Sequence, residues 1–246
     1  MTMQISTLNL TADGRVSLTA YIQQPSPEMP NRAVRPAVII LPGGAYAFLS
    51  DREAEPVALA YLAAGFQAFV LRYTIGGEYA FQAALEDVSG AVELVREHAA
   101  EWHLDPDKIA VCGFSAGGHL AAASGTLAAH KPNALILGYP CILESMSRIL
   151  AFPVPSLDQA VTPETPPAFL FHTRNDSSVS VENSLRFADA LDKAGVPFEL
   201  HIFAEGPHGL SLASSLTSSG REEMVCPDVA AWLPMSVGWL NRLFHL

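Results

Sequence analysis

Residues 108–118 read KIAVCGFSAGG, and this stretch decides the fold that we expect for the chain. The run KIAVC has the apolar composition of a short buried strand, and AGGHLAAASGTLA after the serine is typical of a helix. Gly113 and Gly117 leave room in the turn, because side chains two residues either side of Ser115 would collide with the strand and the helix. The pattern predicts a sharp elbow that exposes the Ser115 hydroxyl at the carboxyl edge of a sheet.

Strand and helix patterns alternate on both sides of this elbow. Short apolar runs predict strands, which we expect at 4–10, 16–21, 37–41, 67–73, 108–112, 134–138, 168–173 and 198–203. Helical spacing predicts the other elements, at 56–65, 81–100, 116–129, 181–193 and 229–244, the last kinked or delayed by Pro234. This alternation predicts an α/β fold in one domain over residues 1–246. We expect about eight mostly parallel strands, the first two antiparallel, with helices on both faces.

The composition narrows the classes of partner. Half of the residues are hydrophobic, and the formal net charge of −11 would repel a phosphate backbone, so we expect a sizeable core and no nucleic acid. No run approaches the roughly 18 apolar residues of a membrane span, and MTMQISTLNL lacks the regions of a signal peptide. A cytoplasmic location without membrane attachment is therefore expected, and a homodimer stays open. Cys112, Cys141 and Cys226 are too widely spaced for a disulfide framework or a metal site.

A serine hydroxyl needs a neighbouring base, and the sequence offers eight histidines. His208 lies in EGPHG (205–209), a loop directly after the last predicted strand, where glycine and proline suit an exposed turn. His119 lies four residues past Ser115, but a ring on the elbow helix is poorly placed for the attacking side. The other histidines are expected near helix ends, at the chain terminus or in strands, in solvated or structural roles: His98, His103, His130, His172, His201 and His245. We therefore predict His208 as the base.

The base in turn needs an orienting carboxylate. Asp176 follows the predicted strand AFLFHT (168–173), just as Ser115 and His208 follow strands of their own. Open α/β sheets build their sites at the carboxyl ends of strands, so the three side chains are expected at one edge. The order serine, acid, histidine along the chain also fits one known arrangement of a catalytic triad. Asp158 is the rival acid, but it lies in a proline-rich stretch with no strand before it.

A second glycine turn follows the strand AVIIL (37–41), in the stretch LPGGAY (41–46). The tandem glycines allow backbone N–H groups to approach a substrate oxygen closely. The N–H of Ala116, at the start of the elbow helix, is expected to have no partner within the helix. We predict that Gly43, Gly44 and Ala116 form an oxyanion hole, in which each donor stabilises a tetrahedral intermediate by about 3–4 kcal/mol.

Four stretches between residues 42 and 210 carry a resemblance to a known family: PGGAY, KIAVCGFSAGGHLAA, VTPETPPAFLFHTRNDSSVSVENS and AGVPFELHIFAEGPHGL. They resemble the α/β-hydrolases of the bacterial acetylesterase and carbohydrate-esterase group, which are neighbours of the hormone-sensitive-lipase-like esterases. The resemblance implies the α/β-hydrolase fold, with Ser115 as nucleophile, Asp176 as acid and His208 as base. It also implies the oxyanion donors predicted above.

Two departures from the family pattern concern the pocket. Leu41-Pro42 stands where many relatives carry a histidine before the glycines, so the support of the oxyanion hole is expected to differ. The cap-like insertion around 140–165 is short for the family. A short insertion implies an open pocket that accepts small acyl groups on bulky alcohols.

The resemblance and the residues together imply acyl transfer through a covalent acyl-enzyme. We expect a serine hydrolase for short-chain carboxylic esters, acetyl esters of sugars among them, with a small-molecule ester as partner and no metal or organic cofactor. A peptidase or lactone hydrolase with the same triad and an inactive binding protein of the same fold are alternatives. A glycoside hydrolase would need two opposed carboxylates, and no pair such as Glu144 and Glu205 has a comparable claim.

Overall fold

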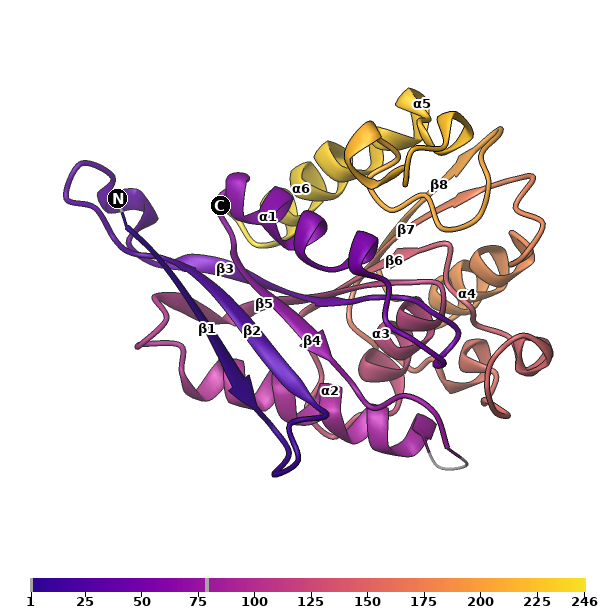
Figure 1. Ribbon diagram of the computed structural model, residues 1–246, viewed down its shortest axis with the longest axis horizontal. Helices are drawn as coiled ribbons and strands as arrows, with labels where there is room; N and C mark the ends of the chain where they lie inside the picture. Colours follow the sequence, from indigo (N-terminus) through magenta and orange to yellow (C-terminus); the bar gives the residue numbers. More distant parts are fainter. Residues whose placement is uncertain (1, 78–79) are drawn as a thin grey trace.

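The chain folds around one sheet of eight strands in the computed structural model, which describes residues 2–77 and 80–246 (Figure 1). The strands are β1 (Met3–Asn9), β2 (Ser17–Gln23), β3 (Arg35–Leu41), β4 (Gln67–Arg72), β5 (Leu104–Phe114), β6 (Ala134–Gly138), β7 (Ala168–Thr173) and β8 (Phe198–Phe203). Their order across the sheet is β1-β2-β4-β3-β5-β6-β7-β8. β2 pairs antiparallel with β1 and with β4, and all pairs from β4 to β8 are parallel. The expected mostly parallel sheet is confirmed, while residues 1, 78 and 79 of the expected domain lie outside the described residues.

Helices cover both faces of this sheet (Figure 1). One face carries α1 (Glu55–Ala63), α5 (Pro227–Ala230) and α6 (Trp232–Leu243), and the other carries α2 (Ala80–Glu97), α3 (Ala116–Thr126) and α4 (Glu182–Lys193). Within β3, Val38 and Ile40 pack with the first group, whereas Ile39 and Leu41 pack with the second. A strand that is covered on both faces has apolar residues at every position, which is why AVIIL shows no alternation.

The predicted helix over 229–244 is two helices in the structure, α5 and α6, which meet at Ala231. Pro234 explains the interruption, because in a continuous helix its ring would clash with the carbonyl group four residues earlier. Since α6 begins at Trp232, Pro234 lies in its first turn, where an N–H has no partner within the helix. Instead of a kink at Pro234, the structure has a break between two helices at Ala231, three residues earlier.

The segment over 140–165 contains two short 3₁₀ turns, η3 (Glu144–Arg148) and η4 (Leu157–Ala160), and packs beside the loop after β3. The N–H of Ala151 donates to the carbonyl of Ala45 at 3.1 Å, and the rings of Phe152 and Tyr46 lie 4.8 Å apart. These contacts place the segment at the carboxyl edge of the sheet, where the loops that carry the predicted residues also meet.

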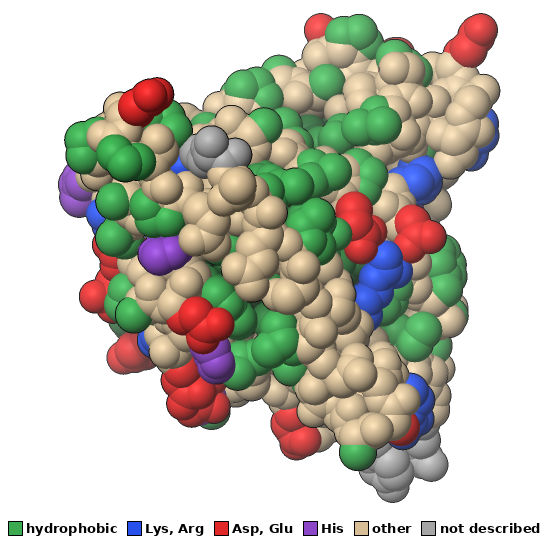
Figure 2. All heavy atoms as spheres, turned by 60° about the vertical axis from the view of Figure 1, so that its left-hand side comes forward, with side chains coloured by type: hydrophobic (Ala, Val, Ile, Leu, Met, Phe, Trp, Pro, Cys, Tyr) green, Lys and Arg blue, Asp and Glu red, His purple; other side chains and the backbone are tan. Residues whose placement is uncertain are grey.

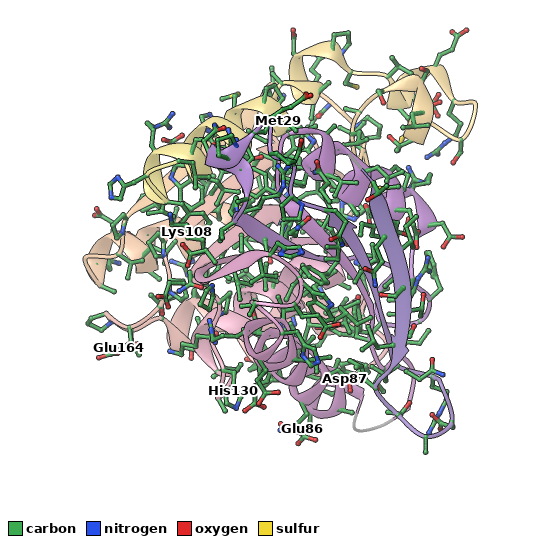
Figure 3. The ribbon with its side chains drawn as sticks, turned by 90° about the vertical axis from the view of Figure 1, so that its left-hand side faces the viewer. Met29, Glu86, Asp87, Lys108, His130 and Glu164 are labelled. Atoms are coloured by element: carbon green, nitrogen blue, oxygen red, sulfur yellow. The ribbon has the colours of Figure 1, made fainter. Side chains whose placement is uncertain are left out.

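Acidic side chains are found at several places on the face that Figure 2 draws. Figure 2 shows Asp and Glu side chains spread over one face among hydrophobic and neutral groups. Glu86, His130 and Glu164 lie at the outer surface in Figure 3, and the Nε2 of His130 is 3.3 Å from the Glu93 carboxylate. None of the helices in the described part of the chain is long and apolar enough to cross a membrane.

Candidate active site

Ser115 occupies the turn between β5 and α3, with backbone angles of φ 53° and ψ −115°. A non-glycine residue rarely adopts a positive φ, and such strain persists only where the surrounding structure imposes it. A Cβ on Gly113 would lie 2.1 Å from the Gly117 carbonyl oxygen, and one on Gly117 would lie 2.2 Å from that of Leu41. The predicted steric reason for glycine at both positions is therefore confirmed.

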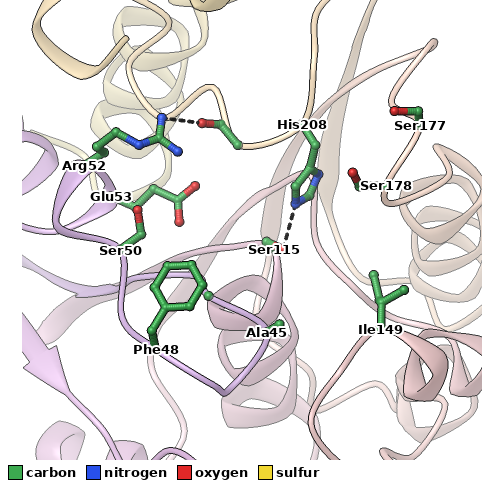
Figure 4. Close-up of a pocket in the computed structure, with 12 residues that line it drawn as sticks. Ala45, Phe48, Ser50, Arg52, Glu53, Ser115, Ile149, Ser177, Ser178 and His208 are labelled. Atoms are coloured by element: carbon green, nitrogen blue, oxygen red, sulfur yellow. Dashed lines mark hydrogen bonds between the residues drawn. The ribbon is translucent and has the colours of Figure 1, made fainter. Parts of the chain in front are cut away.

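The structure brings together Ser115, Asp176 and His208, which follow β5, β7 and β8 respectively. Figure 4 shows the hydrogen bond between Ser115 and His208. The Nε2 of His208 lies 2.8 Å from the Oγ of Ser115, and its Nδ1 lies 2.7 Å from the Oδ2 of Asp176. The rival acid, Asp158, instead accepts a hydrogen bond from the Ser156 hydroxyl at 2.8 Å. Parallel strands that end at one edge thus assemble a chain of hydrogen bonds from residues far apart in the sequence.

The Asp176 carboxylate accepts hydrogen bonds from the backbone as well as from His208. Its Oδ1 accepts two backbone N–H groups of the turn that follows, at 2.8 and 2.9 Å, and its side chain is only 1% exposed. Burial by itself raises the pKa of Asp176, but the neighbouring His172 and His208 rings outweigh it and hold the pKa well below its usual range. The ionised carboxylate keeps the His208 proton on Nδ1, which leaves Nε2 free to accept from Ser115.

Two other buried histidines have partners of their own, and for His172 this is the structural role that the sequence indicated. The Tyr46 hydroxyl donates to the Nδ1 of His119 at 3.0 Å, and the Nε2 of His119 lies 3.4 Å from the Pro155 carbonyl oxygen. Burial lowers the pKa of His119 to about 4, so this ring is neutral near pH 7. The Nε2 of His172 donates to the Val179 carbonyl at 2.9 Å. Neither ring lies between Ser115 and a carboxylate in the way that His208 does.

The loop after β3 contributes Gly44, which lines the same cavity as Ser115. Gly44 has a φ of 135°, and a Cβ there would lie 2.0 Å from the Phe48 carbonyl oxygen, so only glycine fits. Ala116 is the first residue of α3, where its N–H has no partner within the helix. Gly44, in the loop after β3, and Ala116, at the start of α3, thus both lie beside Ser115.

Gly43 differs from the prediction. Its N–H donates to the Oε2 of Glu53 at 2.8 Å, so a carboxylate already holds the proton that was assigned to the oxyanion. A single N–H that is aimed at one acceptor cannot make a second well-directed hydrogen bond elsewhere. Gly43 is therefore not an oxyanion donor in this structure, and its N–H instead ties the loop after β3 to Glu53.

A cavity of about 670 Å³ opens beside Ser115 and His208 (Figure 4). Phe48 and Ile149, which are 59% and 46% exposed, form apolar parts of its wall. Several serine residues line the cavity as well. The guanidinium of Arg52 donates to two carbonyl groups of the loop that carries His208, at 2.9 and 3.0 Å. Among the described residues, no group of three or more His, Cys, Asp and Glu side chains could hold a metal ion.

Sequence reasoning missed Glu53, Arg52 and Tyr139. Glu53 and Arg52 line the cavity, and the ring of Tyr139 lies 5.0 Å from the His208 ring. Ser50 and Glu53 have the spacing of a capping box, and this local signal hides the inward direction of Glu53. In the structure Ser50 makes no side-chain cap, and Glu53 ends a 3₁₀ turn with its carboxylate buried.

Comparisons with known proteins agree with this architecture. Residues 25–136 match the BD-FAE family, and residues 150–225 match the prolyl oligopeptidase family. The crystal structure of an α/β-hydrolase enzyme from a Medee basin deep-sea metagenome library is 43% identical, with 99% of each chain covered and a TM-score of 0.93. That of an acetyl ester-xyloside bifunctional hydrolase from Caldicellulosiruptor lactoaceticus is 36% identical, with 93% of this chain and 88% of that one covered and a TM-score of 0.79.

A curated relative points the same way over part of its length. An acetylxylan esterase of Xylanibacter ruminicola is 29% identical over 263 residues, which cover 95% of this chain and 52% of that protein. The chain spans 34%, 52% and 63% of the length of three curated relatives that it matches, so part of each of them lies outside the match. The likenesses confirm the resemblance that the four sequence stretches carry.

Proposed function

The chain belongs to the α/β-hydrolase family, and from that membership we propose that it is a serine esterase for short-chain carboxylic esters. The observation that carries the proposal is the line of two hydrogen bonds from Asp176 through His208 to Ser115, at the wall of an open cavity. Such a line activates a hydroxyl that would otherwise be a weak nucleophile.

The proposed reaction has two halves. In the first, His208 takes the proton of the Ser115 hydroxyl while Oγ bonds to the ester carbonyl carbon, and the N–H groups of Gly44 and Ala116 stabilise the oxyanion. His208 then gives its proton to the leaving alcohol as the acyl–oxygen bond breaks, and the acyl group stays on Ser115. In the second half, His208 takes a proton from water while the water oxygen bonds to the acyl carbon. His208 then returns the proton to the Ser115 Oγ as the acyl–Oγ bond breaks, and the carboxylic acid is released. Throughout, the Asp176 carboxylate stabilises the imidazolium form of His208.

We place a small acyl group and a hydroxylated alcohol in the cavity, with acetylated sugars as the substrate class. The volume of about 670 Å³ far exceeds an acetyl group, and it lies within the range of pockets for small molecules. Hydroxyl groups of Ser50, Ser177 and Ser178 line the cavity together with the apolar Phe48 and Ile149. This mixture suits a sugar ring, which presents both apolar faces and hydroxyl groups, and the names of the esterase relatives support the same class.

The test is hydrolysis of p-nitrophenyl esters from acetate to octanoate by the wild type, Ser115→Ala and the control Ser145→Ala, whose serine is exposed. We expect activity that is highest on acetate, survives in the control and disappears in Ser115→Ala. A fluorophosphonate probe should label the wild type and the control but not Ser115→Ala. Labelling that persists in Ser115→Ala would refute the proposed nucleophile.

A peptidase is the second candidate, because residues 150–225 match the prolyl oligopeptidase family. A peptidase would use the same triad on an amide, so Ser115→Ala cannot separate the two functions. Hydrolysis of peptide p-nitroanilides with a kcat/KM above that for the esters would favour it. Hydrolysis of plain xylan that persists in Ser115→Ala would instead point to glycoside hydrolysis by other residues.

A further inference from the structure

Glu53 is a buried carboxylate that takes no part in the proposed proton transfers. It ends η2 (Asp51–Glu53), is 3% exposed and lines the cavity beside Ser115. Figure 4 shows its carboxylate pointing toward the cavity. A carboxylate is stable away from water only where other donors replace its hydration, so its partners indicate its role.

Two donors from different parts of the chain meet at this carboxylate. The Gly43 N–H donates to Oε2 at 2.8 Å, and the Tyr139 hydroxyl donates to Oε1 at 2.6 Å. The carboxylate is therefore held by two hydrogen bonds, and each bond restrains a different segment of the site.

The first restrained segment is the loop after β3. Gly44, Ala45 and Tyr46 all have positive φ angles, of 135°, 55° and 59°. Residues other than glycine adopt such angles only where neighbouring groups impose them. By holding the Gly43 N–H, Glu53 sets the orientation of the backbone that leads into Gly44. The direction of the Gly44 N–H, the proposed oxyanion donor, follows from that orientation.

The second restrained segment is the loop that carries His208. The Tyr139 hydroxyl also accepts the N–H of Ser211 at 2.8 Å, and its ring meets the His208 ring edge-on, with 5.0 Å between the centroids. Burial and the nearby Glu53 charge raise the pKa of Tyr139 well above its ordinary value. The phenol therefore stays protonated and continues to donate to Glu53.

We propose that Glu53 is a positioning residue that holds the oxyanion loop and the His208 loop in one arrangement. The inference rests on the proposed function, because it assigns the Gly44 N–H to the oxyanion. That oxyanion exists in the tetrahedral intermediate and not in the bound ester. Loss of Glu53 should therefore lower kcat and leave KM nearly unchanged.

The experiment compares Glu53→Gln and Glu53→Ala with the matched control Glu55→Gln. Glutamine keeps the shape of the side chain but offers one acceptor oxygen, and its NH₂ group faces the second donor. We expect kcat per active site to fall roughly 10-fold in Glu53→Gln and roughly 10²-fold in Glu53→Ala, with KM within about twofold. Glu55 lies two residues away on α1 and pairs with Arg72 at 3.1 Å, so its variant should keep the wild-type kcat. Active-site titration and thermal unfolding measure the folded, competent fraction of each variant.

Each outcome separates this inference from the proposed function. A wild-type kcat in both Glu53 variants would overturn the inference and leave the serine-esterase proposal in place. A raised KM at unchanged kcat would also overturn it, because Glu53 would then contact the bound ester. If the wild type hydrolyses no ester, the proposed function fails, and the rate of fluorophosphonate labelling of Ser115 still tests Glu53. Slower labelling in Glu53→Gln than in Glu55→Gln would support the inference, and equal rates would overturn it.

Discussion

Asp176→Asn is expected to lower kcat by about 10⁴ while the fold persists, because it reverses the hydrogen bond to His208. The Oδ1 of Asp176 accepts the N–H groups of Ser178 and Val179, so the oxygen of asparagine must stay at that place. Its NH₂ group then takes the place of Oδ2, 2.7 Å from the Nδ1 of His208. A donor there requires Nδ1 to accept, which moves the ring proton to Nε2. The ring then points a proton at the Ser115 Oγ, 2.8 Å away, and can no longer take one from it.

A loss of about 10⁴ corresponds to about 5.4 kcal/mol of transition-state stabilisation, since each factor of ten is about 1.36 kcal/mol. The assay is the initial rate of p-nitrophenyl acetate hydrolysis, with circular dichroism to compare the folds. Asp158→Asn is the matched control, because it changes the same group in the rival acid, which contacts Ser156. We expect that control to stay within about twofold of the wild type. An Asp176→Asn enzyme that keeps a tenth of the wild-type kcat, or an equal loss in the control, would refute the assignment.

Two further predictions concern stability. Gly117→Ala should destabilise the protein by several kcal/mol, because its Cβ would lie 2.2 Å from the Leu41 carbonyl oxygen. Gly90→Ala, in α2 with no atom within 4 Å of the new Cβ, should instead stabilise it by about 1 kcal/mol; urea unfolding of the two variants tests the contrast. Burial lowers the pKa of His119 from 6.5 to about 4, so the unfolded chain takes up this proton first as the pH falls. The contribution of the neutral His119 ring to the free energy of unfolding is therefore complete above about pH 6.5. As the pH falls to about 4.5, the free energy of unfolding should decrease by about 2–3 kcal/mol through this residue. His119→Gln should reduce this dependence, and an unchanged slope of unfolding free energy against pH would contradict it.

Local sequence was enough to predict the elbow and the order of the proposed triad. A Cβ on Gly113 would meet Gly117 inside the motif, whereas one on Gly117 would meet Leu41 at the end of β3. The motif predicts both demands because an elbow of this kind packs closely between a strand and a helix. The strands were visible for a similar reason, because burial on both faces requires an unbroken apolar run such as AVIIL. Strand ends in a parallel sheet share one edge, so three residues that each follow a strand could be expected to meet there.

Only the tertiary structure decided the roles of Gly43 and Glu53. The sequence pattern offers Gly43 as an oxyanion donor, but the direction of its N–H depends on an acceptor ten residues away in a short turn. Glu53 and Tyr139 are 86 positions apart, and no periodic pattern relates them. Periodicity and motif spacing report which faces are buried and where a turn must be tight. The direction of one amide and the partner of one buried carboxylate instead follow from how distant loops pack, because hydrogen bonds depend on position and angle in space.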